Sequence, residues 1–354
     1  MSDVLIGVSA CLLGEQVRYD GGHKRNAFLL EDLAPHVRFV PVCPEVGIGL
    51  GVPREAIRLV RRGDRIRLLG SAGVDHTDAM RRWAETVTGE LRERDLSGFV
   101  LKKGSPTCGL ERVRVWDEGL ERPARPARGA FAQALVDAMP TLAIEEEGRL
   151  NNPGLREHFA DRVFAHARVR DFFAGRWTAE SLIRFHSAEK AAVLAHDAES
   201  ARRLGRLVAG QGRLQPELLA RSYRELHGVA FARPATPGRQ ANALMHLAGH
   251  LKGALGSCDR QELREAIEDY RVGLVPVAVP LALLSRHLRA AGTEWARSQT
   301  YLQPYPKELG LRGLISKPRG GRRAARTERP PAFELEPTGS GEVAKSDVVK
   351  ISGG

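Results

Sequence analysis

Three of the four cysteines in this 354-residue sequence stand just after short apolar runs. Cys11 follows VLIGVSA, Cys43 follows VRFVPV, and Cys108 follows the run that begins at Gly98, after the turn GSPT. Such runs are typical of buried β-strands. The carboxyl ends of parallel strands meet at one edge of a sheet, where ligands bind. The fold can therefore bring these three thiols together.

The chemistry of three such thiols is open on spacing alone. Buried cysteines can be small hydrophobes, but each of these is embedded in a polar turn with glycine or proline, which favours a site. Thiolates select zinc, copper(I) or iron–sulfur clusters. His23 could complete a Cys3His zinc site. Iron–sulfur clusters usually have four cysteine ligands, so three would leave one iron open to a substrate atom.

The elements that must position these residues alternate between strand and helix. A helical pattern with a capping residue starts at Thr77 and runs to about Arg94. Alternation with near-continuous apolar strands predicts an α/β domain with a mostly parallel, Rossmann-like sheet. The expected strands are 4–10, 37–42, 65–70, 98–103 and 142–147.

The character of the sequence changes near Arg176. Thr178 is a predicted helix N-cap, followed by apolar residues at helical spacing. Because no strand pattern competes, this region is predicted to be all-α. Further helices are expected at about 215–227, 239–256, 260–271 and 279–298, and the segment after Arg312, rich in Pro, Gly and charge, is expected to be a disordered basic tail.

Composition and charge limit the class of protein. The longest apolar stretch, 272–285, is interrupted by Pro276 and Pro280 and is too short to span a bilayer. A cytoplasmic protein is therefore expected, in which cysteines bind metals or react rather than form structural disulfides. The net charge is +11, and residues 170–312 contribute 21 Lys and Arg against 14 Asp and Glu. This excess fits a nucleic-acid partner, and equally an arginine-rich solvated surface.

Three segments resemble the thiouracil desulfidase family of bacterial [4Fe-4S] proteins. They are VSACLLGEQVRYDGGHK, CPEVGIGLGVPRE and KKGSPTCG, and the resemblance covers residues 1 to about 165. The segments FHSAEKAAVLAH, NALMHLAGHLKGAL and QTYLQPYPKELGLR resemble a helical domain often fused to it. The combination resembles bacterial tRNA 4-thiouridine desulfidases. It implies a desulfidase domain at 1–168, a tRNA-binding helical domain at 169–312 and a tail at 313–354.

The resemblance also implies roles for particular residues. Cys11, Cys43 and Cys108 would hold three irons of a [4Fe-4S] cluster, whose fourth iron would capture the thiocarbonyl sulfur and polarise the C=S bond. Glu45 corresponds to the family's general base. Ser105 corresponds to a serine that relays a proton or positions the ring, although a turn-stabilising hydroxyl is the plain alternative. Sulfur would leave as sulfide with no net redox change.

Other polar residues are candidates for substrate or tRNA contacts. Cys258, in GSCDRQE, is expected at the end of a helix, as a helix-junction residue outside the ligand set. The enzyme alternative is a desulfidase of free thiouracil or thionucleosides, and a rival from another class is a redox-sensing nucleic-acid-binding protein. The substrate candidates near the cysteines are Asp20, His23, Lys24 and Lys103, and the tRNA candidates in the helical region are Arg184, Lys190, Arg202, Arg203, Arg206 and Lys252.

Overall fold

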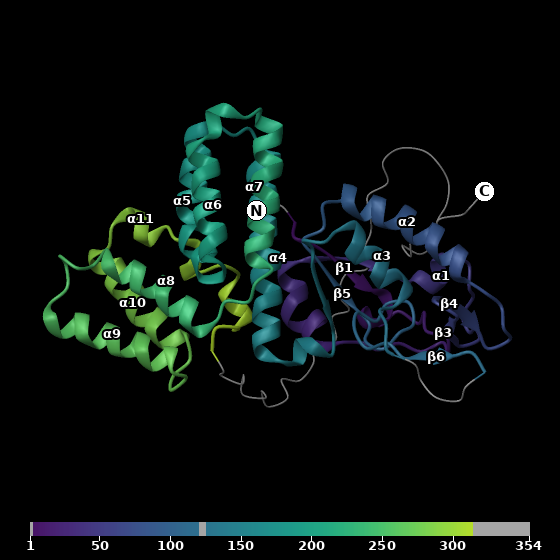
Figure 1. The fold of residues 1–354 in the computed structure, drawn as a ribbon. Coiled ribbons are helices and arrows are strands. Elements are labelled where there is room, and N and C mark those ends of the chain that lie inside the picture. The colour runs from purple at the N-terminus through teal and green to yellow at the C-terminus, as the bar shows by residue number, and fades with distance from the viewer. Residues whose placement is uncertain (1–2, 120–124, 314–354) are drawn as a thin grey trace.

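The computed structural model describes residues 3–119 and 125–313. An α/β part built on a parallel sheet is followed by an all-helical part (Figure 1). This arrangement confirms the predicted fold class. The predicted tail lies outside the described residues from position 314 onward.

The main sheet has four parallel strands in the order β2-β1-β5-β7. The central strand β1 pairs with β2 on one side and with β5 on the other, so that Gly7 lies between Val40 and Phe99. Residues 4–10, 37–42, 98–103 and 142–147, predicted as strands, form these four. Their bounds are β1 Leu5–Ser9, β2 Arg38–Val42, β5 Gly98–Leu101 and β7 Ala143–Glu146.

Helices cover both faces of this sheet, because its strands are apolar on both sides. Ile6, Val8 and Val100 pack on one face against a short π-helix and α4. Phe99 and Leu101 pack on the other face with α2 and α3. The bounds are Phe28–Leu33 for the π-helix, α1 Pro44–Gly47, α2 Thr77–Glu93, α3 Ala130–Ala138 and α4 Pro153–Ala174.

The prediction for residues 65–70 was wrong in one respect. They form a strand, but it belongs to a separate three-stranded sheet in the order β4-β3-β6. Strand β4 is antiparallel to β3 and joined to it by the two-residue turn Gly63–Asp64. A tight hairpin of this kind cannot connect parallel strands. The bounds are β3 Ile57–Arg62, β4 Arg65–Gly70 and β6 Val115–Asp117, and neither β3 nor β6 was anticipated.

The second part consists of helices with a continuous apolar core. Thr178 caps the first of them as predicted, with its side chain accepting a hydrogen bond from the backbone of Ser181. Asp197 caps the next helix directly after the first, with its side chain accepting a hydrogen bond from the N–H of Ser200. The bounds are α5 Ala179–His196, α6 Ala198–Ala209, α7 Pro216–Phe231, α8 Pro237–Gly249, α9 Ser257–Arg271, α10 Ala278–Ala291 and α11 Glu294–Arg297.

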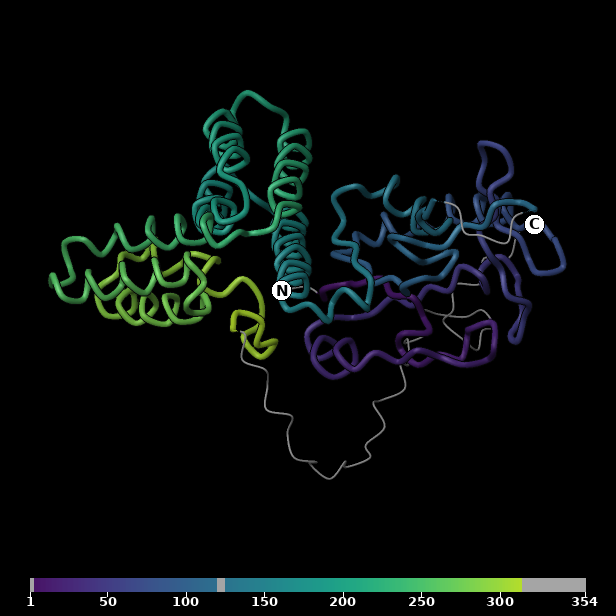
Figure 2. Tube along the Cα trace, turned by 60° about the horizontal axis from the view of Figure 1, so that its bottom comes forward, coloured from purple at the N-terminus to yellow at the C-terminus, as the bar shows by residue number. Residues whose placement is uncertain are grey.

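Helix α4 belongs to both parts of the molecule. Phe159 and Val163 pack in the core of the sheet domain, whereas Val169 packs in the helical core. The predicted boundary between residues 168 and 169 therefore falls inside one helix. Residues 300–312 return from the helical part to α4 (Figure 2), where Tyr305 and Leu309 join the core of the sheet domain.

The helical part contacts the edge of the sheet at which the strands begin. Arg170 donates to the carbonyl of Asp3, just before β1. Arg224 of α7 pairs with Asp95, just before β5. Because all four strands are parallel, their carboxyl ends lie at the opposite edge, away from these contacts.

No helix in the described parts of the chain combines the length and the apolar character needed to cross a bilayer.

Candidate functional site

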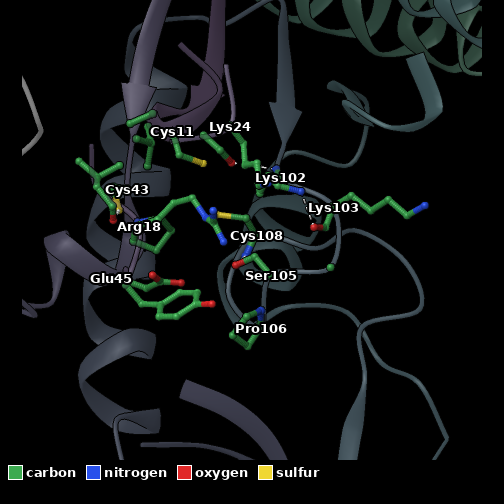
Figure 3. A pocket seen from close by; sticks show the side chains of 17 residues that line it. Cys11, Arg18, Lys24, Cys43, Glu45, Lys102, Lys103, Ser105, Pro106 and Cys108 are labelled. Carbon is green, nitrogen blue, oxygen red and sulfur yellow. Dashed lines mark hydrogen bonds between the residues drawn. The ribbon is translucent and has the colours of Figure 1, made fainter. Parts of the chain in front are cut away.

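A cavity of about 270 Å³ lies at the carboxyl ends of β2, β1 and β5. Cys11 reaches it from the turn after β1, Cys43 from the start of α1, and Cys108 from the loop after β5 (Figure 3). All three are free and buried. The structure thus brings together the three cysteines singled out in the sequence.

The loop that carries Cys108 depends on two glycines and a hydroxyl. Gly104 has φ of +70°, a conformation that favours glycine. A side chain on Gly109 would collide with Val113 and with the carbonyl of Ser105. The hydroxyl of Ser105 accepts hydrogen bonds from the N–H groups of Thr107 and Cys108, at 3.2 and 3.1 Å. Ser105 therefore both lines the cavity and stabilises its turn.

The three thiols share a desolvated environment. Burial, followed by the neighbouring Cys43, raises the pKa of Cys11 to about 12. Burial also raises the pKa of Cys108, with smaller contributions from Glu45 and the other two thiols. The pKa of Cys43 is raised as well, again mainly by burial. Thiols in such a place remain protonated unless a cation binds them.

The carboxylate of Glu45 lies at the cavity wall and has a partner for each oxygen. Thr107 donates a hydrogen bond of 2.9 Å to Oε1. The guanidinium of Arg54 forms an ion pair with Oε2. The side chains of Glu45 and Arg54 are only 15% and 5% exposed, so this is a largely buried pair.

Several cationic side chains lie at the same cavity. Arg18 points into the space between the cysteines in Figure 3 and forms an ion pair of 3.3 Å with Asp20. Lys102 pairs with Glu147 at 2.6 Å. Lys24 and Lys103 also line the cavity, although the side chain of Lys103 extends away from the cysteines (Figure 3). These charges can offset thiolates or bind an anionic group.

The remaining sequence candidates lie elsewhere. Asp20 and His23 do not line the cavity. Asp20 accepts from the N–H of Gly22, and His23 Nδ1 accepts from the N–H of Arg25, so both organise the loop after Cys11. Cys258 is exposed near the beginning of α9, rather than at the end of a helix as expected.

The six basic candidates of the helical part are all exposed. Arg184 pairs with Glu180, and both Arg202 and Arg206 pair with Glu199, so part of this charge is balanced locally. They belong to the part that contacts the opposite edge of the sheet from the cavity. A ligand that touched both would have to extend across the sheet domain.

The donor set at the cavity fits an iron–sulfur cluster. Three soft thiols line one cavity together with cationic side chains. In residues 3–119 and 125–313, no three Cys, His, Asp or Glu side chains are placed to hold one metal ion. A cluster does not require this, because it binds each thiolate to a different iron.

The sequence did not identify Arg54 and Thr107 as site residues, although they lie in the segments CPEVGIGLGVPRE and KKGSPTCG. Their contacts to Glu45 span nine and 62 residues. An arginine after GVP and a threonine before a cysteine look like ordinary loop residues. The only available signal was their presence in segments that resemble a family.

Comparison with known proteins supports the resemblance for both parts of the chain. The family model described as 2-thiouracil desulfurase matches residues 6–147, and that of a protein family of unknown function, DUF1722, matches residues 190–306.

Two curated proteins and one solved structure are similar to this chain. The uncharacterized protein YbgA of Escherichia coli K12 is 30% identical over 152 residues, which cover 43% of this chain and 90% of YbgA. The uncharacterized protein YbbK of Bacillus subtilis 168 is 29% identical over 111 residues, which cover 30% of this chain and 73% of YbbK. A solved structure described as the [4Fe-4S]-dependent thiouracil desulfidase TudS is 32% identical, with a TM-score of 0.35, and the match covers 42% of this chain and 94% of that one. This chain belongs to the thiouracil desulfidase family and is an enzyme of that family, with a DUF1722 region behind the desulfidase domain.

Proposed function

We propose that this enzyme removes the sulfur of 4-thiouridine in tRNA and leaves uridine, with a [4Fe-4S] cluster held by Cys11, Cys43 and Cys108. The observation that supports this most strongly is that the three thiols and the carboxylate of Glu45 line one cavity. A redox sensor does not require, beside its cysteines, a largely buried carboxylate with a partner on each oxygen.

The residues at the cavity suggest how the reaction proceeds. The bound cluster supplies a thiophilic Lewis acid that polarises the C=S bond. Glu45 accepts a proton from the water that attacks C4 of the ring. Water provides the new oxygen and sulfur leaves as hydrogen sulfide, so no electrons are gained or lost. Arg54 and Thr107 hold the carboxylate toward the cavity.

The cavity and the charge distribution together support a tRNA substrate. A volume of about 270 Å³ is slightly below the ~300–1,000 Å³ of small-molecule pockets. It is too small for a folded polymer, so beside the cluster it would admit no more than the base of the substrate. The basic excess on the helical part provides phosphate contacts remote from the base. Free thiouracil is the second candidate, favoured by the same small cavity and by the name of the matching family.

The test compares two substrates in one assay of sulfide release. Anaerobically purified protein is given either tRNA containing 4-thiouridine or free 4-thiouracil. Reversing the charge of Arg202, Arg203 and Arg206 with glutamate should lower activity on tRNA about tenfold or more, and should reduce its salt dependence, because phosphate contacts release counterions. Activity on the free base should not change.

A matched control reverses three exposed arginines of the sheet domain that do not line the cavity, Arg58, Arg65 and Arg82. It should leave the ratio of tRNA to free-base activity unchanged. If the helical variant also leaves this ratio unchanged, these arginines do not bind tRNA. If only the free base reacts, the second candidate is correct.

A further inference from the structure

A chain of hydrogen bonds joins Ser105 at the cavity to the carboxylate of Glu45. The hydroxyl of Thr107 lies 2.9 Å from Ser105 Oγ and 2.9 Å from Glu45 Oε1. Thr107 is fully buried, with 0% of its surface exposed. Its hydroxyl is therefore limited to protein partners.

The hydroxyl protons of Ser105 and Thr107 run in one direction along these hydrogen bonds. Thr107 has one hydroxyl proton, which it donates to Oε1 of Glu45, the carboxylate that also pairs with Arg54. Thr107 Oγ1 also lies 3.7 Å from Cys108 Sγ, but the closer carboxylate is the stronger acceptor. Ser105 already accepts from two N–H groups. Its own proton must go to Thr107, and the order is Ser105 to Thr107 to Glu45.

Arg54 pairs with the other carboxylate oxygen and links it to the loop that follows Cys11. Its guanidinium donates to the carbonyls of Val17 and Gly51, at 2.9 and 3.2 Å, besides pairing with Glu45. Its backbone N–H donates to the carbonyl of Tyr19 at 2.9 Å. Val17 and Tyr19 line the cavity. Arg54 thus links Glu45 to the loop that follows Cys11.

We propose that Thr107 and Arg54 form a clamp that fixes the Glu45 carboxylate in its working position, and that Ser105 acts through Thr107. This inference rests on the proposed function, in which Glu45 is the catalytic residue. Thr107 and Arg54 are positioning residues in this scheme.

A clamp matters here because a free glutamate side chain occupies many rotamers. With one partner on each oxygen, the carboxylate plane is fixed, and each oxygen retains a lone pair for the attacking water. A shift of about 1 Å in a catalytic group can lower the rate about 10²-fold.

The test replaces Thr107 by valine, which keeps its shape, and by serine, which keeps its hydroxyl. Thr107→Val should retain the iron content and absorption spectrum of the wild type. Its kcat should fall about tenfold to 100-fold, with KM within about threefold. Thr107→Ser should restore kcat to within about threefold of the wild type. Thr88→Val is the matched control, because Thr88 is also buried but bonds within α2, to the carbonyl of Glu85.

A second measurement separates positioning from a general structural role. In the Glu45→Gln background, Thr107→Val should cause no further loss of kcat, since there is no base left to position. Denaturant unfolding is then measured, without cluster, for the wild type, Glu45→Gln, Thr107→Val and the double variant. Their changes in stability should be non-additive, which reports the contact between Thr107 and Glu45 independently of turnover. Arg54→Lys keeps the charge but not the planar fork, and should lower kcat at least tenfold.

Each outcome bears on one claim. Loss of iron in Thr107→Val would show that Thr107 supports Cys108 instead, and unchanged kcat or additive stability effects also overturn the clamp. Unchanged kcat in Arg54→Lys removes Arg54 from it. A cluster-loaded wild type that releases no sulfide from either substrate overturns the proposed function, whereas the stability cycle still decides whether the clamp exists.

Discussion

Segments that resemble known families lie in both parts of this molecule, but their polar residues do different things. In the sheet domain, Cys43 and Glu45 face a cavity. In the helical part, Glu189 of FHSAEKAAVLAH is fully buried and forms a bidentate pair with Arg168, at 2.7 and 3.1 Å. Glu189 also contacts Nε2 of His227 at 3.3 Å.

Both carboxylates are paired, but Glu45 also lines a cavity, whereas Glu189 is fully buried. Burial lowers the pKa of His227, and its Nε2 lies within hydrogen-bond distance of Glu189. The amide of Gln299 bonds the backbone of Ser187 and Ala191 within the helical part. The segments that resemble a family therefore line a cavity in the first part and form part of a packed core in the second.

The largest expected effect comes from the cavity cysteines. Replacing Cys11, Cys43 or Cys108 by alanine should abolish both the cluster and sulfide release, because in the proposed cluster each thiolate would hold a different iron. Cys258→Ala should spare both, since Cys258 is exposed on α9. Iron and sulfide analysis with the absorption spectrum measures this. Colourless wild-type protein with one bound zinc would contradict the assignment.

Breaking the buried pair between Glu189 and Arg168 should lower the stability of the protein without changing the rate of the reaction. Glu189→Gln leaves the charge of Arg168 uncompensated, which costs ~3–5 kcal/mol. The melting temperature should fall, while the folded variant at low temperature keeps its cluster and its kcat on free thiouracil. The exposed Glu217→Gln is the control. A selective loss of kcat with unchanged stability would show that the helical motif serves catalysis.

Unlike Glu189→Gln, Glu45→Gln should lower the rate of the reaction. The amide keeps the size of the side chain but cannot accept the proton, so the rate should fall roughly 10²-fold. The iron content should stay at the wild-type level. Turnover near that of the wild type would mean that another group activates the water.

The smallest effect is the pH dependence of stability caused by Glu157, on the helix α4 that the two parts share. Burial, and then Asp161, raises the pKa of Glu157 to about 7 from its ordinary 4.5. Since ionisation is harder in the folded state, the free energy of unfolding should decrease as pH rises from about 4.5 to 7. Glu157→Gln should remove this loss, a gain of up to ~3 kcal/mol at pH 8. Melting curves at pH 5 and 8 measure it, and an equal effect at both values would contradict it.

Local signals predicted much of this structure. Apolar runs located four strands of the parallel sheet, and the capping pattern at Thr178 was confirmed because a cap depends on residues three positions apart. The turns holding Cys11, Cys43 and Cys108 could be placed at strand ends for the same reason. Such features need no knowledge of distant segments.

Features made by distant contacts could not be predicted. The pairing of Leu59 with Val115 creates a second sheet from segments 56 residues apart. The hold of Thr107 on Glu45 and the position of the helical part at the far edge of the sheet depend on the assembled fold. A single sequence carries no periodicity that encodes them.

The shared helix α4 has a consequence for how the molecule unfolds. A helix of 22 residues that buries Phe159 in one core and Val169 in the other cannot melt at one end without exposing the next turn. Calorimetry should therefore record one cooperative transition instead of the two that independently folding domains give. The two parts then unfold together. A substitution that destabilises the helical core therefore also lowers the fraction of molecules in which the cavity is formed.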